Sequence, residues 1–164
     1  MLPTLTRLQA KSRSLQSLFG WLFGFGSFLL FSELAYDPLK AVLMAGDGEA
    51  AAAWRNLATM AAAALPILAL LAALWSARSV FKAMAAGDVL SAASSAALGR
   101  VGDWLIVSAV LGLGFGPFGD RLDALGTAYL SALVVLAALG LAIRLLGRVH
   151  ALAAEIAADN RQII

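Results

Sequence analysis

Asp103 and Arg144 are the residues of this chain whose types and positions most directly suggest chemistry. Each lies just inside a long apolar segment, where an ionisable side chain is costly and usually functional. Both fall at a similar predicted depth, so we predict an intramembrane ion pair, with Arg100 as a competing partner for Asp103. The alternatives are that Arg144 extends to the lipid headgroups, or that the pair handles ions or protons. A proton relay needs titratable groups through the whole depth, and the middle of each apolar segment has none.

Residues typical of catalysis are scarce. The chain has no cysteine, which excludes disulfides, thiolate metal sites and thiol catalysis. Its single histidine, His150, forms neither a metal site nor a catalytic triad. The pattern Gly112-x-Gly114-x-Gly116 lacks the preceding strand and following helix of a phosphate-binding loop. We therefore predict a non-enzymatic protein with no catalytic residue, no metal ligand and no cofactor.

The composition indicates what surrounds these residues. Of the 164 residues, 62% are hydrophobic and 13% are charged, and the mean hydropathy is +0.87. Soluble domains are about 45–50% apolar and about 25% charged. A soluble fold of this size exposes a large fraction of its surface to water, so the surplus apolar surface requires a lipid bilayer. An alanine-rich soluble bundle is the less favoured alternative, because it would carry a charged face on each helix.

Four segments are long and apolar enough to cross the bilayer, which takes about 20 helical residues. They run over about 15–35, 57–81, 101–118 and 127–146, and residues 147–164 continue as a helical tail. Isolated strands cannot satisfy their backbone groups in lipid, so each segment must be a helix. We predict an all-α fold: an integral membrane four-helix bundle forming one domain over residues 1–164. Trp21, Trp54, Trp75 and Trp104 fall toward the segment ends, as interfacial anchors do.

The basic residues indicate how these segments are oriented. Nine of the twelve Lys and Arg residues fall on one side of the predicted topology, and Lys40, Arg55 and Arg121 fall on the other. Basic residues in short loops mark the cytoplasmic side, so we predict that both termini are cytoplasmic. The nine are Arg7, Lys11, Arg13, Arg78, Lys82, Arg100, Arg144, Arg148 and Arg161.

Small residues at four-residue steps predict close helix packing. Gly20 and Gly24 lie on the first segment, and Ser108, Gly112 and Gly116 lie on the third. Such spacing exposes backbone for close approach of a second helix. We expect either that the first and third segments touch or that one of these faces forms a homodimer. Pro66 should kink the second segment, with a neighbour satisfying the freed carbonyl.

The connection between the second and third segments is predicted to be capped at both ends. Gly87 can end a helix in the left-handed conformation, and Ser91 can cap the next helix. We expect a short link through Leu90 and a helix over about 92–100 along the cytoplasmic face. This connection is either a docking platform for a cytosolic partner or, as the residues favour, a well-capped helix hairpin. The candidate contacts are Lys82, Asp88, Leu90, Ser91 and Arg100.

At this connection the chain resembles a known family. The residues that carry the resemblance are Phe81-x5-Gly87-Asp88-Val89-Leu90-Ser91, followed by Leu98-Gly99-Arg100-Val101-Gly102-Asp103-Trp104-Leu105, and the tail Asp159-Asn160-Arg161-Gln162-Ile163-Ile164. The pattern is similar to that of the bacterial membrane family called domain of unknown function 2975, over about residues 60–164. Leu90 stands where that family has an aromatic residue, and Ser94-Ser95 replaces a stretch with asparagine.

The resemblance implies a function. Members have four spans and no assigned catalytic role, and they often accompany a small helix-turn-helix regulator of the Xre type. It therefore implies a multi-pass protein of the bacterial inner membrane that binds or modulates such a cytosolic regulator, without touching nucleic acid itself. The alternative is a small transporter or ligand-binding membrane component, which predicts a polar cavity near Glu33, Ser108 or Asp103.

The tail is the second candidate contact surface. Leu152 and Ile156 fall on one side of its predicted helix, and Glu155 and Asp159 fall on another. Its end can insert into a partner's groove or fold back on the inner leaflet, and the resemblance favours the partner. The candidate contacts in the tail are Glu155, Asp159, Asn160 and Ile163.

Overall fold

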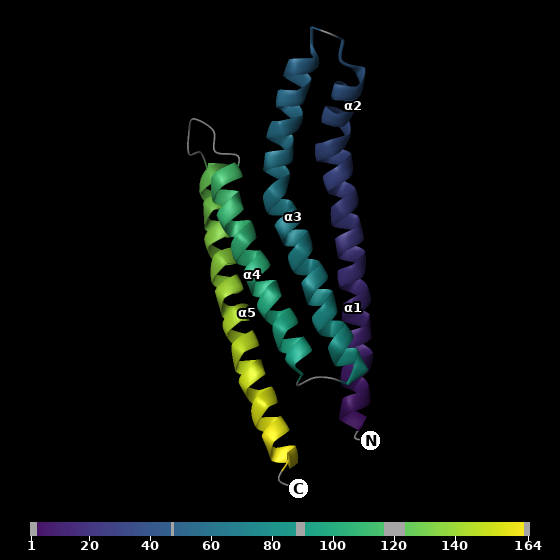
Figure 1. The fold of residues 1–164 in the computed structure, drawn as a ribbon, viewed down its shortest axis with the longest axis vertical. Helices are drawn as coiled ribbons and strands as arrows, with labels where there is room; N and C mark the ends of the chain where they lie inside the picture. Colours follow the sequence, from purple (N-terminus) through teal and green to yellow (C-terminus); the bar gives the residue numbers. More distant parts are fainter. Residues whose placement is uncertain (1–2, 47, 88–90, 117–123, 163–164) are drawn as a thin grey trace.

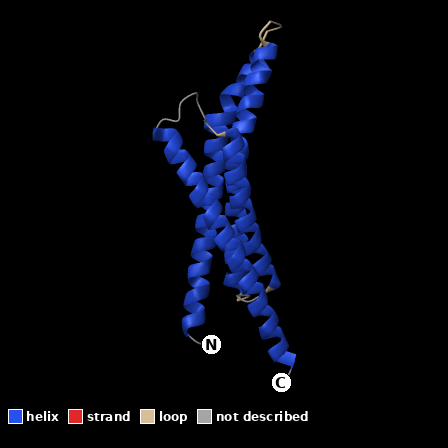
Figure 2. Ribbon diagram, turned by 90° about the vertical axis from the view of Figure 1, so that its left-hand side faces the viewer, coloured by secondary structure: helices blue, strands red, loops and turns tan. Residues whose placement is uncertain are grey.

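The computed structural model describes residues 3–46, 48–87, 91–116 and 124–162, and in these ranges the ordered elements are all helices (Figures 1 and 2). Four helical stretches are long and apolar enough to cross a membrane: Gln9–Met44, Ala50–Ala86, Ala92–Phe115 and Gly126–Asp159. The prediction of an all-helical chain with four membrane-length helices is therefore confirmed. The fold is that expected of a multi-pass membrane protein.

The first helix is longer than predicted. Helix α1 (Pro3–Leu29) passes through a π-helical turn, η1 (Leu30–Ala35), directly into α2 (Tyr36–Met44). The Tyr36 N–H donates to the Phe31 carbonyl, five residues back, which is the π-helical hydrogen bond. The first segment was predicted to end near residue 35, and that end is therefore wrong, because the helix continues to Met44. Pro38 lies in the first turn of α2, directly after the π-helical turn, and the helix continues past it.

Helix α3 (Ala50–Ala86) runs through Pro66 as one helix. A proline removes the donor for the carbonyl four residues earlier, which here belongs to Ala62. The neighbouring helix instead reaches the carbonyl of Pro66 itself, because the Ser108 hydroxyl donates to that oxygen at 2.8 Å. An interhelical hydrogen bond is thus present near the proline, but contrary to the prediction it does not satisfy the carbonyl that the proline frees.

Both predicted caps around the third helix, α4 (Ala92–Phe115), are confirmed. Gly87 ends α3 in the left-handed region, with φ of 93°. The Ser91 hydroxyl accepts a hydrogen bond from the Ser94 N–H at 3.2 Å. Residues 92–100 are the first turns of α4 and not a separate helix lying along the membrane surface. Ser94, Ser95 and Ala97 are buried there, so the surface-helix prediction is wrong.

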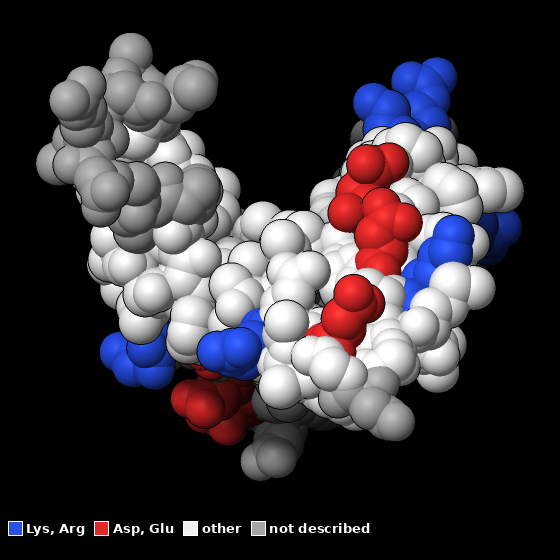
Figure 3. All heavy atoms as spheres, turned by 90° about the horizontal axis from the view of Figure 1, so that it is seen from above, with Lys and Arg blue, Asp and Glu red and all other residues white. Residues whose placement is uncertain are grey.

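Helix α5 (Ala124–Gln162) contains both the last apolar segment and the tail, so the predicted helical extension is confirmed. The four long elements pack in chain order: α1 on α3, α3 on α4, and α4 on α5. Among the described residues α1 contacts neither α4 nor α5, so the expected contact of the first and third segments is wrong. The bundle is consequently open, and Figure 3 shows that it is hollowed along one face.

The outer surface of this open bundle, in which the helices pack as one layer, is apolar. Large hydrophobic side chains are exposed on every long helix, including Trp21 at 75%, Leu43 at 78% and Val134 at 68%. Exposing so much apolar surface to water is unfavourable, whereas exposing it to lipid is not. The start of α1, the end of α3, the start of α4 and the end of α5 lie at one end of the bundle (Figure 1).

We predict that the Ser108–Pro66 hydrogen bond stabilises the α3–α4 contact. Ser108→Ala should lower the free energy of unfolding in detergent by about 1 kcal/mol, since interhelical hydrogen bonds in membranes are worth roughly that. Ser131→Ala is the matched control, because the Ser131 side chain is exposed and bonds to Ala128 in its own helix. Equal losses in the two variants, measured by denaturant titration, would contradict this prediction.

Candidate functional site

The predicted partners Asp103 and Arg144 are in contact. Arg144 Nε lies 3.2 Å from Asp103 Oδ1, and this ion pair joins α4 to α5. Both side chains are about half exposed, at 53% for Asp103 and 48% for Arg144. Asp103 thus pairs with Arg144 and not with the competing Arg100, whose side chain is exposed on α4. A pair at this exposure stabilises helix contact without forming an enclosed polar site.

Glycines bring the two backbones together beside this pair. A Cβ on Gly102 would lie 2.5 Å from the Gly140 carbonyl oxygen and 2.7 Å from the Arg144 nitrogen. A Cβ on Gly147 would lie 3.0 Å from the Gly99 nitrogen. We call Gly99, Gly102, Gly140 and Gly147 the glycine seam. The seam positions Asp103 beside Arg144, because it fixes how closely the two helices approach. We did not predict the glycine seam. The seven-residue spacing of Gly140 and Gly147 in the sequence could have indicated it.

The predicted packing residues have different outcomes. Gly112 lies against α5, since a Cβ there would be 2.6 Å from Leu133 Cδ2. Gly20 lies against α3, where a Cβ would be 3.4 Å from Arg78 Nε. Gly24 has open space around it, so it mediates no close helix packing within the described chain. Gly116 follows the last residue of α4 in an extended conformation. A homodimer through the Gly24 face stays a prediction.

The predicted partner-binding residues are spread over the end that carries the termini. Lys82, Arg100, Glu155 and Asp159 are exposed on α3, α4 and α5, and Ser91 is used as the α4 cap. Asn160 lies in the last turn of α5, and its side chain is outside the described part of the chain. Asp88, Leu90 and Ile163 lie outside the described residues.

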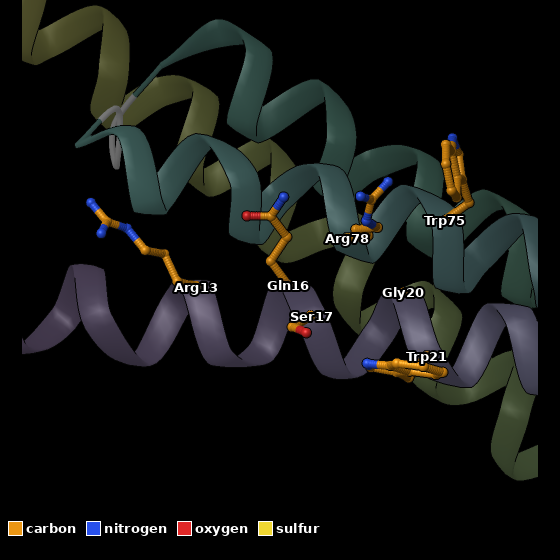
Figure 4. Close-up of a pocket in the computed structure, with 7 residues that line it drawn as sticks. All are labelled: Arg13, Gln16, Ser17, Gly20, Trp21, Trp75 and Arg78. Carbon is orange, nitrogen blue, oxygen red and sulfur yellow. The ribbon is translucent and has the colours of Figure 1, made fainter.

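A polar cavity that we did not predict lies between α1 and α3 (Figure 4). Its volume is about 630 Å³, and we call it the arginine cavity. Arg78 Cζ lies 4.8 Å from the centre of the Trp75 ring, a cation–π contact. Arg78 Nε is buried and has no hydrogen-bond partner among the described residues. The cavity is lined by Arg13, Gln16, Ser17, Gly20, Trp21, Trp75 and Arg78.

The sequence carried a partial signal for this cavity. We used Arg13 and Arg78 only to predict which side of the membrane is cytoplasmic. Trp21 and Trp75 were predicted only to be interfacial anchors. Each is a basic or aromatic residue near a span end, so the four share one predicted depth. Their convergence depends on the pairing of α1 with α3, which the sequence did not show.

Two apolar grooves accompany the arginine cavity. One, of about 540 Å³, lies between α1 and α3 and is lined by Phe23, Leu30, Leu71, Ala72 and Trp75, among others. The other, also about 540 Å³, takes residues from all four long helices. Because α1 and α5 do not touch each other, this second groove lies on the hollowed face of the layer. Among the described residues, no three potential metal ligands come together.

Comparison with protein-family models, with curated proteins and with solved structures finds no match to this chain.

We predict that the glycine seam cannot accept even one methyl group at Gly102. Gly102→Ala should lower the free energy of unfolding by about 1–3 kcal/mol, because the new Cβ would overlap backbone atoms of α5. Gly114→Ala is the control on the same helix, since its Cβ would meet no atom within 4 Å. It should be neutral or slightly stabilising through higher helix propensity. The measurement is thermal unfolding in detergent, and equal destabilisation of both variants would contradict the prediction.

We predict that Asp103 and Arg144 are energetically coupled. Asp103→Asn, Arg144→Gln and the double variant form a cycle whose coupling free energy should be about 0.5–1 kcal/mol, modest because both side chains are half exposed. Combining Asp103→Asn with Arg100→Gln should give a coupling near zero. A larger coupling to Arg100 than to Arg144 would show that the competing pair dominates in solution.

Proposed function

We propose that this chain is a non-enzymatic multi-pass protein of the bacterial inner membrane that binds and modulates a cytosolic helix-turn-helix regulator. The contact surface in this proposal is the projecting end of α5 together with the neighbouring end of α3 and the start of α4. The protein has both termini in the cytoplasm and does not itself bind nucleic acid. It acts by holding the regulator at the membrane.

The orientation in this proposal is supported by charge. The start of α1, the end of α3, the start of α4 and the end of α5 lie at one end of the bundle (Figure 1). Most of the basic residues belong to these segments. Short basic segments remain on the cytoplasmic side during insertion. The folded arrangement is compatible with this topology, because the segments concerned share one end.

The exposed stripe on the α5 extension is the observation that carries the proposal. Gly147 packs beside Ser95 of α4, and α4 begins at Ala92, so the antiparallel α5 extends beyond its neighbour soon afterwards. On this extension Leu152 and Ile156 are each 60% exposed, one helical turn apart. An unpartnered apolar stripe on a helix is suited to a hydrophobic groove of another protein. The resemblance to the domain of unknown function 2975 supplies the class of partner.

A second candidate function is a ligand-binding membrane component. The polar cavity expected for it near Ser108 is not supported, because that side chain is buried and bonds to Pro66. Asp103 is paired with Arg144, and Glu33 is exposed on η1. The arginine cavity between α1 and α3 favours this second candidate instead.

We predict that a photoreactive amino acid at Leu152 or Ile156 crosslinks the full chain, in cells, to a protein with a helix-turn-helix domain. The same group at Val134 should crosslink only to lipid, because Val134 is 68% exposed in the apolar first half of α5. Leu152→Asp combined with Ile156→Asp should move the captured regulator from the membrane fraction to the soluble fraction. Lipid adducts alone at both Leu152 and Ile156 would show that the extension lies on the leaflet, and would overturn the proposal.

A further inference from the structure

The two arginines of the arginine cavity have no acidic partner among the described residues. The described lining of the cavity contains no Asp or Glu, and neither Arg13 nor Arg78 forms an ion pair among the described residues. Arg78 Nε is also buried without a hydrogen-bond partner. A guanidinium without a carboxylate partner gains from an anionic acceptor, because charge-assisted hydrogen bonds are stronger than neutral ones. The cavity is therefore complementary to an anion.

The side chains beside the arginines suit a phosphate group. The Gln16 amide and the Ser17 hydroxyl line the same cavity and offer further neutral donors. The Arg78 side chain lies against α1 at Gly20, where a Cβ would be 3.4 Å from Nε. Figure 4 shows that these groups come from two helices, with Gln16 and Ser17 on α1 and Arg78 on α3.

The cavity continues into an apolar groove. Trp75 lines both the arginine cavity and the groove that contains Phe23, Leu71 and Ala72. Along α1 and α3 alike, the lining changes from polar to apolar in the direction away from the end that holds the termini. A phospholipid has this order of chemistry, with a charged headgroup followed by acyl chains. A free phosphate ion would use the cavity and leave the groove unused.

Tryptophans place this junction at the membrane interface. Trp21 is 75% exposed and Trp75 is 50% exposed, and both line the arginine cavity. Amphipathic aromatic rings concentrate at headgroup level, and basic pockets between membrane helices bind anionic headgroups. We propose that the arginine cavity binds the phosphate of an anionic glycerophospholipid, with one acyl chain in the adjoining groove. This inference rests on the second candidate function and is independent of the regulator.

Lipid binding to the purified full chain tests this inference without any protein partner. Phosphatidylglycerol and phosphatidylcholine with identical acyl chains are titrated separately into the detergent-solubilised chain, and bound lipid is counted by native mass spectrometry. The wild type should bind phosphatidylglycerol about tenfold more tightly. Arg13→Gln and Arg78→Gln should each reduce this preference about fivefold, through loss of one cation near the headgroup. Arg78→Lys keeps the charge and should keep most of the preference.

Matched variants separate the cavity from general surface charge. Arg100→Gln removes an exposed arginine outside the cavity and should leave the preference unchanged. Ala72→Leu fills the groove, so it should weaken both lipids several-fold and leave their ratio unchanged. If Arg78→Gln does not fold, Arg13→Gln carries the test, because Arg13 is exposed on α1.

Three results would overturn the inference. The first is equal affinity of the wild type for the two lipids. The second is an equal loss of preference in Arg100→Gln and in the cavity variants, which would indicate a nonspecific charge effect. The third is displacement of phosphatidylglycerol by millimolar inorganic phosphate or glycerol phosphate, which would indicate a site for soluble phosphates instead of lipid.

Discussion

Close approach of helix backbones at small residues is the interaction on which this structure depends. Lipid tails are as apolar as the helix surfaces, so the hydrophobic effect does not hold membrane helices together, and tight packing must. Helix α4 supplies that packing on two faces. The glycine seam brings it against α5, and Ser108 bonds it to α3 at Pro66. These contacts place α4 between α3 and α5. They also bring Asp103 of α4 beside Arg144 of α5.

Helices α1 and α3 are held together differently, which explains why the cavities lie between them. Their contacts include the aromatic pairs Phe19–Phe81 and Phe23–Trp75, with ring centres 5.2 and 5.1 Å apart. Bulky rings keep the backbones farther apart than glycines do, and irregular space remains around them. The arginine cavity and its groove occupy that space. The open order of the helices, in which α1 contacts only α3 among the long helices described, leaves this interface accessible to lipid.

The sequence predicted what depends on one segment or on local spacing, and it failed where partner choice matters. Segment hydropathy, the Gly87 and Ser91 caps and the matching positions of Asp103 and Arg144 near the ends of their segments were readable because each is a local property. Small residues at four-residue steps correctly marked Gly112 and Ser108 as packing positions but gave the wrong partner helix. Such spacing shows that another helix packs closely at these residues, but it does not identify that helix. The end of the first segment was predicted too early, because a π-helical turn carries the helix on to Met44. The arginine cavity was hidden because its two arginines are far apart in the chain.

The arginines of this chain fall into two physical classes, and the difference bears on function. Arg144 has a carboxylate partner within the fold, so its charge is compensated by Asp103 and the pair adds a modest contact between α4 and α5. Arg13 and Arg78 have no such partner among the described residues, yet one buried nitrogen of Arg78 is removed from water. An unsatisfied buried donor lowers the stability of a fold. Arg78 therefore does not owe its place to stability alone. The anionic lipid proposed above would supply the missing partner in a cavity that leads into an apolar groove.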